Sequence, residues 1–229
     1  MDTALIEARG LTKTFGPAPI LRGVNLRIGL GGGAMIVGSN GAGKSTLVRI
    51  LAGLSAPTAG SALLFNRPSQ SLDGSLRART GLVTHQSFLY PNLTARENLV
   101  FYADLYGRRR DAGEISAWLQ RVGLTRAADD RVRNFSRGME QRLTLARALL
   151  SQPDILLMDE PFAALDPEGV ALTGGLLREA RERGCALLLT AHQELAVAGI
   201  EFDCYEIVRG RLLPFAEANR ERLRTQRAG

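Results

Sequence analysis

The glycine-rich segment Gly38–Ser45 constrains the fold more than any other part of the chain, because a different hydrophobic pattern stands on each side of it. The run Ala34–Val37 before it is wholly apolar, which is typical of a buried strand. From Lys44 onwards the apolar side chains recur with the 3.6-residue period of a helix. The sequence therefore predicts a strand, a tight loop and a helix in direct succession.

The spacing within this loop is Gly-x-x-x-x-Gly-Lys-Ser, which is the pattern of a phosphate-binding loop. Glycines let the backbone turn tightly, so that successive N–H groups and the positive end of the helix dipole face one anion. We expect Lys44 to reach the β- and γ-phosphates of ATP, and the Ser45 hydroxyl to bind Mg²⁺. The residues predicted to hold the nucleotide here are Gly38, Ser39, Asn40, Gly41, Ala42, Gly43, Lys44, Ser45 and Thr46.

A second candidate segment lies downstream, where the apolar run Ile155–Met158 ends in two acids. A buried strand in that position brings Asp159 to its carboxyl end, beside the phosphate loop, where the carboxylate can hold Mg²⁺ through water. Glu160 is predicted to project towards the γ-phosphate and to orient or deprotonate the attacking water. The pattern is weak alone and gains its meaning from the phosphate loop upstream.

The whole pattern predicts an α/β fold with a mainly parallel sheet, because wholly apolar strands alternate with helices. The stretch from about 88 to 150 is helical instead: Thr94 and Glu97 form a capping box, and Gly123 ends a second helix. We therefore expect one domain over 1–229, with a core at about 1–87 and 151–215, a helical subdomain at about 88–150 and a basic tail at about 216–229.

Composition limits where the chain is expected to work. No apolar run approaches the roughly 18–20 residues that span a bilayer, and the first residues lack the apolar core of a signal peptide. The net charge is +6, but apart from 108–110 and 220–227 the arginines are scattered. We interpret this charge as solvated loops and tail, so no nucleic acid partner is expected. Cys185 and Cys204 lack metal-ligand spacing and are predicted to be reduced thiols in the cytosol.

The segment Phe135–Arg142 resembles the signature Leu-Ser-Gly-Gly-Gln of the ABC ATPase family, and further motifs of that family follow in order through almost the whole chain. By this resemblance Phe15 matches the aromatic residue that stacks on adenine. Gln86 matches the glutamine that joins the nucleotide site to the helical subdomain and contributes to the magnesium site. Asp166 matches the D-loop aspartate, and His192 the switch histidine that contacts the γ-phosphate.

The resemblance implies a P-loop NTPase (RecA-like) core with an N-terminal antiparallel β portion and an inserted α-helical subdomain. The catalytic residues would be Glu160, His192 and Gln86. The residues of the magnesium site would be Ser45, Gln86 and Asp159.

The resemblance also implies an ATPase that works as a pair, here a homodimer. Each ATP would lie between one phosphate loop and the partner's signature helix, where Ser136 and Gly138 would offer N–H groups to the γ-phosphate. Arg137 and Met139 depart from the family signature in a way that is similar to many exporter ATPases. Ala163 stands where a D-loop serine is common, which puts one hydrogen bond across the dimer in doubt.

The stretch Thr84–Gly107, with the signature, looks like the ATPase of the haem-handling ABC complex of cytochrome c maturation. The alternatives are the ATPase of a drug or antibiotic exporter and a soluble ABC ATPase of the iron–sulfur assembly type. Transport requires integral membrane subunits, so the chain is expected to be cytoplasmic and peripheral at the inner face of the cell membrane. Phe88, Leu89 and Tyr90 either form core or line a groove for a helix of the membrane subunit. His85 has no predicted role beyond packing or hydrogen bonding.

Overall fold

The computed structural model describes residues 4–108, 111–194, 197 and 199–218. Of the predicted basic segments, 109–110 and 219–229 lie outside the described residues. Within the described ranges, no helix is both long and apolar enough to cross a membrane.

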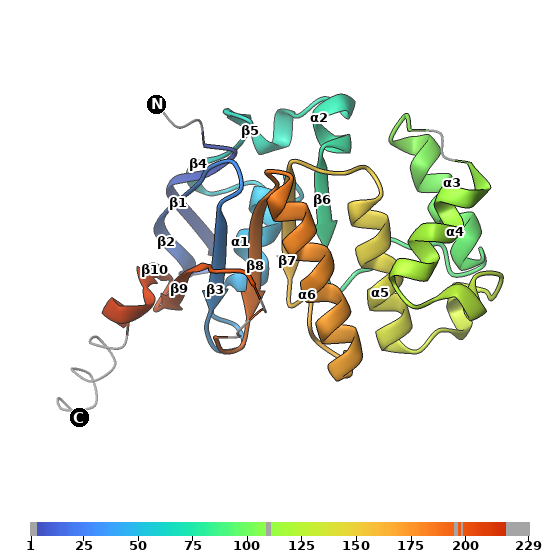
Figure 1. The fold of residues 1–229 in the computed structure, drawn as a ribbon. Helices are drawn as coiled ribbons and strands as arrows, with labels where there is room; N and C mark the ends of the chain where they lie inside the picture. Colours follow the sequence, from blue (N-terminus) through green and yellow to red (C-terminus); the bar gives the residue numbers. More distant parts are fainter. Residues whose placement is uncertain (1–3, 109–110, 195–196, 198, 219–229) are drawn as a thin grey trace.

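A six-stranded sheet forms the centre of the protein, in the order β10-β9-β3-β8-β7-β6 (Figure 1). Every neighbouring pair in it is parallel except β9 and β10, so the predicted mainly parallel sheet is confirmed. Its central strands β3, β7 and β8 are wholly buried, as strands covered on both faces must be. The strands are β3 (Gly33–Val37), β6 (Thr80–Val83), β7 (Ile155–Asp159), β8 (Ala186–Ala191), β9 (Asp203–Val208) and β10 (Arg211–Pro214).

A second, antiparallel sheet of four strands lies at the left of Figure 1, in the order β2-β1-β4-β5. Its presence confirms the antiparallel N-terminal portion that the resemblance implied. The strands are β1 (Ile6–Phe15), β2 (Ala18–Ile28), β4 (Ala59–Leu64) and β5 (Arg67–Pro68).

Two apolar cores cover the two faces of the parallel sheet. One includes buried side chains of the antiparallel sheet and of helix α1 (Lys44–Leu51), together with Ile36 and Leu188. The other joins the opposite face to α5 (Arg137–Leu149), α6 (Pro167–Glu182) and the helices beyond them. Because α1 begins where β3 and its loop end, the first core holds the start of that helix in place.

Helices α3 (Ala95–Leu105) and α4 (Ala112–Arg121) pack beside α5 at the right of Figure 1. The predicted capping box is present, since Thr94 Oγ1 accepts a hydrogen bond from the Glu97 N–H at 3.1 Å and Glu97 Oε2 accepts one from the Thr94 N–H at 2.7 Å. The short elements are η1 (Ser69–Ser71), α2 (Gly74–Ala78), η2 (Thr125–Ala127) and η3 (Val132–Asn134). The division into a core and a subdomain at 88 and 150 stays a prediction.

Candidate nucleotide site

The glycine loop lies between β3 and α1, as its sequence context predicts. Gly43, the residue before α1, has φ +110°, a conformation that residues with a side chain rarely adopt. A Cβ at this position would lie 2.9 Å from Leu21 Cδ2 and 3.0 Å from Ile20 Cγ2. Only glycine therefore lets the chain turn from the loop into the helix here.

Lys44 is the first residue of α1, and its side chain folds over the loop that precedes it. Only 5% of the residue is exposed. Its ammonium donates hydrogen bonds to the carbonyl oxygens of Gly38 at 2.7 Å and Ser39 at 3.2 Å. The loop thus carries a positive charge, shielded from bulk water, at the place where phosphate binding is predicted.

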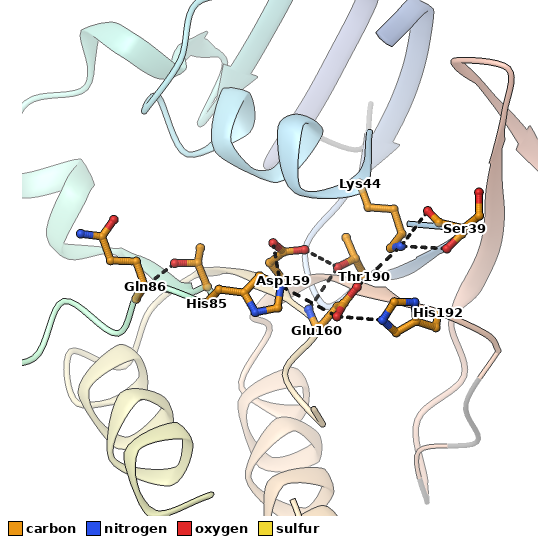
Figure 2. A network of polar contacts seen from close by, with 10 residues as sticks. Ser39, Lys44, His85, Gln86, Asp159, Glu160, Thr190 and His192 are labelled. Atoms are coloured by element: carbon orange, nitrogen blue, oxygen red, sulfur yellow. Dashed lines mark hydrogen bonds and ion pairs between the residues drawn. The ribbon is translucent and has the colours of Figure 1, made fainter. Parts of the chain in front are cut away.

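Two acids face this cation from the end of β7 (Figure 2). Glu160 Oε1 lies 3.6 Å from Lys44 Nζ, and Glu160 Oε2 lies 3.1 Å from His192 Nε2. Asp159 is 4% exposed and lies at the last position of the strand. The structure therefore brings Lys44, Glu160 and His192 into one network, with Asp159 directly beside it.

Thr190 holds both acids and was missed by the sequence reasoning, which treated it only as the end of an apolar strand. Its buried hydroxyl donates to Asp159 Oδ1 at 2.7 Å and accepts a hydrogen bond from the Glu160 N–H at 3.1 Å. The contact arises because β7 and β8 are parallel neighbours in which Asp159 pairs with Thr190. A polar residue at the carboxyl end of each of two apolar strands was the available signal.

His85, for which the sequence predicted only packing or hydrogen bonding, lies close to both acids. Its Nε2 lies 3.8 Å from Glu160 Oε2 and 4.0 Å from Asp159 Oδ2. Its side chain is 66% exposed, whereas that of Asp159 is 4% exposed. The neighbouring Gln86 behaves differently: in Figure 2 its side chain points away from the carboxylates, and no described contact joins it to them.

The donors predicted for Mg²⁺ are the Ser45 hydroxyl, the Gln86 amide oxygen and the Asp159 carboxylate. All are hard oxygen ligands, which this ion prefers. The hydrogen bond from Thr190 fixes the Asp159 carboxylate, which is the support that metal-binding carboxylates receive in proteins. The chemistry of the set thus fits Mg²⁺, although Gln86 would have to turn inwards to join it.

The remaining predicted residues lie outside this network. Phe15, at the end of β1, is 55% exposed, and Lys13 Nζ stands 4.8 Å from the centre of its ring. Ser136 caps α5, since its Oγ accepts a hydrogen bond from the Met139 N–H at 3.3 Å. Asp166 caps α6 in the same way, through the Gly169 N–H at 2.8 Å. No described contact joins Phe15, Ser136, Gly138 or Asp166 to Lys44 or Glu160 of the same chain.

Comparison with known proteins gives the family. The family model described as "ABC transporter" matches residues 21–163. A Nod factor export ATP-binding protein I of Paraburkholderia xenovorans is 38% identical over 194 residues, which are 84% of this chain and 64% of that protein. The linearmycin resistance ATP-binding protein LnrL of Bacillus subtilis is 30% identical over 89% of this chain and 65% of its own length. The cytochrome c biogenesis ATP-binding export protein CcmA 2 of Cupriavidus metallidurans is 34% identical over 89% of this chain and 96% of its own length.

A solved structure agrees with these relatives. The dimeric post-hydrolysis state of the ATP-binding cassette MJ0796, bound to ADP and Pi, superposes with a TM-score of 0.80 at 29% identity, over 90% of this chain and 96% of that one. The chain spans somewhat less than two thirds of the length of the Nod factor and linearmycin relatives. Both the family model and the relatives cover most of the chain, including the phosphate loop and the two acids. The chain therefore belongs to the ABC transporter family.

Proposed function

We propose that the chain is the ATP-binding and ATP-hydrolysing subunit of an ABC transporter, with the site residues in the roles that follow. The observation that carries the proposal is the position of Glu160, whose carboxylate lies between the loop cation Lys44 at 3.6 Å and His192 at 3.1 Å. A carboxylate in this position can take a proton from water while the cation faces the phosphates.

The reaction follows from this arrangement. Lys44 would exchange its hydrogen bonds with the loop carbonyls for the β- and γ-phosphate oxygens of ATP. Glu160 would orient a water molecule and accept its proton as the water oxygen bonds to the γ-phosphorus and the bond to the ADP oxygen breaks. His192, which contacts the other side of Glu160, would donate a hydrogen bond to the transferred phosphoryl group. Mg²⁺, held by Ser45 and Asp159 with Gln86, would neutralise charge on the phosphates.

The second half of each site would come from another copy of the chain. Ser136 caps a helix of 13 residues, so the free N–H groups of its first turn can bind the γ-phosphate of the facing subunit. Ser136→Arg should therefore abolish ATP-dependent dimerisation, which is measured by size-exclusion chromatography with the slowly hydrolysing Glu160→Gln background. Mixing Ser136→Arg with Lys44→Ala chains leaves at most one intact site in each heterodimer. Dimerisation that survives Ser136→Arg would exclude this pairing.

The proposed docking surface for the membrane subunit lies on the helical side. Leu89 is buried, but Tyr90 is 46% exposed and Phe101 is 38% exposed, and their rings meet edge to face at 4.8 Å. Val100 and Leu105, on the same helix as Phe101, are also exposed. An apolar surface of this kind suits a short helix of a membrane protein. The cassette would then be cytoplasmic and peripheral at the inner face of the membrane.

For the cargo we propose haem handling in cytochrome c maturation. Two observations support this choice. Residues 84–107 resemble the haem-handling ATPase of cytochrome c maturation, and the alignment with the relative CcmA 2 covers 96% of the length of that protein. The second candidate is a drug or antibiotic exporter, which the linearmycin resistance relative favours. A soluble cassette of the iron–sulfur assembly type is the third.

Deleting the gene and restoring it separates these candidates. The haem proposal expects loss of covalently bound haem in c-type cytochromes, measured by haem staining of gels, and recovery with the wild-type chain but not with Glu160→Gln. Normal c-type cytochromes with increased sensitivity to an antibiotic would favour the exporter. Purification of the tagged chain without any polytopic membrane protein would favour the soluble cassette.

A further inference from the structure

Arg147 is a buried cation on α5 that the proposed reaction does not use. Only 5% of the residue is exposed, and its Nη2 donates a hydrogen bond to the carbonyl oxygen of Leu82 in β6. Its Nε has no hydrogen-bond partner, and no carboxylate forms a salt bridge with it, within the described part of the chain. Because burying a guanidinium is costly without such partners, another interaction must compensate for it.

Two aromatic rings provide that interaction. The centre of the guanidinium lies 5.2 Å from the Tyr102 ring centroid and 5.8 Å from that of Phe88, within the range of cation–π contacts. The Tyr102 hydroxyl donates a hydrogen bond to the Phe88 carbonyl oxygen. Burial raises the pKa of Tyr102, although the nearby Arg147 opposes the shift, so the phenol stays a neutral donor. Arg147 and Tyr102 together therefore hold Phe88 by both its ring and its backbone.

Phe88 is the residue that needs such a hold. Its φ is +57°, in the left-handed region that a residue with a large side chain occupies only when its surroundings impose it. It lies two residues after Gln86 and two before Tyr90, whose N–H donates to Asn98 Oδ1 at 2.8 Å. The loop thus runs from the nucleotide site to the exposed aromatic surface with a strained residue in its middle.

We propose that Arg147 is a positioning residue that clamps the loop containing Gln86, Phe88 and Tyr90 (the Gln86 loop) to helices α3 and α5. The loop and these helices then move as one unit. A membrane subunit that docks on Tyr90 and Phe101 would therefore also displace Gln86. The proposal rests on the proposed function for the meaning of Gln86, but the clamp itself is defined without nucleotide.

Hydrogen–deuterium exchange of the nucleotide-free chain tests the clamp, with the peptide that contains Tyr90 as the reporter. Arg147→Met keeps a long apolar side chain and removes the cation. Its loop amides should exchange about tenfold faster than those of the wild type, because the strained segment opens more often. Strands β3, β7 and β8 should keep their protection. Arg147→Lys keeps a cation under the rings and should restore part of the protection.

Two further variants make the test specific. Arg142→Met is the matched control, since Arg142 lies on the same helix but donates to the Val122 carbonyl oxygen, away from the loop; its loop exchange should be that of the wild type. Tyr102→Phe retains the ring and removes the hydrogen-bond donor to the Phe88 carbonyl oxygen, so it should also raise the exchange rate of the loop amides. This variant replaces Arg147→Met as the test of the clamp if Arg147→Met does not fold. Unchanged loop exchange in Arg147→Met or Tyr102→Phe would overturn the clamp, as would equal acceleration throughout the sheet.

Steady-state kinetics give an independent readout. Displacement of Gln86 should lower the kcat of Arg147→Met while the KM for ATP stays near that of the wild type, because Lys44 and the glycine loop are untouched. A raised KM with normal kcat would count against the clamp. A wild-type chain without ATPase activity would refute the proposed function, yet it would leave the exchange result valid.

Discussion

Replacing Glu160 by glutamine should separate nucleotide binding from hydrolysis. The substitution keeps the size of a side chain that is largely buried between Lys44 and His192 and removes only its charge and basicity. Loss of a positioned base costs about 10²–10⁴-fold in rate, or roughly 2.7–5.4 kcal/mol of transition-state stabilisation. Binding should not weaken. The ion pair of 3.6 Å between Glu160 and Lys44 is lost, which frees the ammonium for the phosphates.

The assay compares single-turnover hydrolysis with ATP affinity and with dimer formation. Glu160→Gln should hydrolyse one equivalent of ATP at least about a hundredfold more slowly than the wild type. It should also form dimers at lower ATP concentration than the wild type, seen by light scattering after chromatography. A variant that turns over ATP at the normal rate would refute the assignment of the base, and His192 would then be the residue to test. Slow turnover with weak ATP binding would instead point to a disturbed loop.

Three other perturbations test neighbouring groups. Lys44→Ala should lose ATP binding and hydrolysis together, measured with a fluorescent ATP analogue and by phosphate release, and near-normal activity would exclude the phosphate loop as the site. Thr190→Val should lower kcat by about tenfold to a hundredfold, because the Glu160 N–H and Asp159 each lose a hydrogen bond, whereas Thr190→Ser should recover most of it; equal rates in both variants would remove Thr190 from the site. Burial, with Glu194 beside the thiol, raises the pKa of Cys204 to about 11. At pH 8 Cys204 should therefore react with iodoacetamide far more slowly than an ordinary thiol and gain speed towards pH 10, and fast labelling at pH 8 would contradict this.

The parts of the site that follow from local sequence could be predicted. Gly43 adopts a backbone conformation that favours glycine, Lys44 begins a helix, and Asp159 ends an apolar strand. Each of these residues can be recognised from its immediate neighbours in the sequence. The capping box at Thr94 and Glu97 is local in the same sense. These features depend only on the backbone of a few consecutive residues. The local sequence therefore determines them wherever the segment lies in the fold.

The parts that depend on strand pairing could not be predicted. Thr190 meets Asp159 only because β8 lies beside β7 in a given register, and a shift of one residue would turn its hydroxyl to the other face. His85 reaches Glu160 from the loop after β6, which is the parallel neighbour of β7, and no periodicity predicts the direction of that loop. Arg147 is a similar case. An arginine in an amphipathic helix is typical of the solvated face, yet the fold buries Arg147 against the rings of Phe88 and Tyr102.

Two residues with a strained backbone are each held in place by long-range contacts of this kind. Glu160 and Phe88 both have positive φ, +53° and +57°, directly after or close to the carboxyl end of a strand. Each such residue costs roughly 1–3 kcal/mol and persists only when its surroundings over-determine it. A glycine would remove the cost, but at position 160 it would also remove the carboxylate and at position 88 the ring that faces Arg147. The restraining groups are accordingly long-range: the Thr190 hydroxyl for Glu160, and Arg147 with Tyr102 for Phe88. Weakening either restraint should therefore relax the neighbouring loop first and the sheet last, which is why exchange rates and kcat, and not the melting temperature, are the sensitive measures of both.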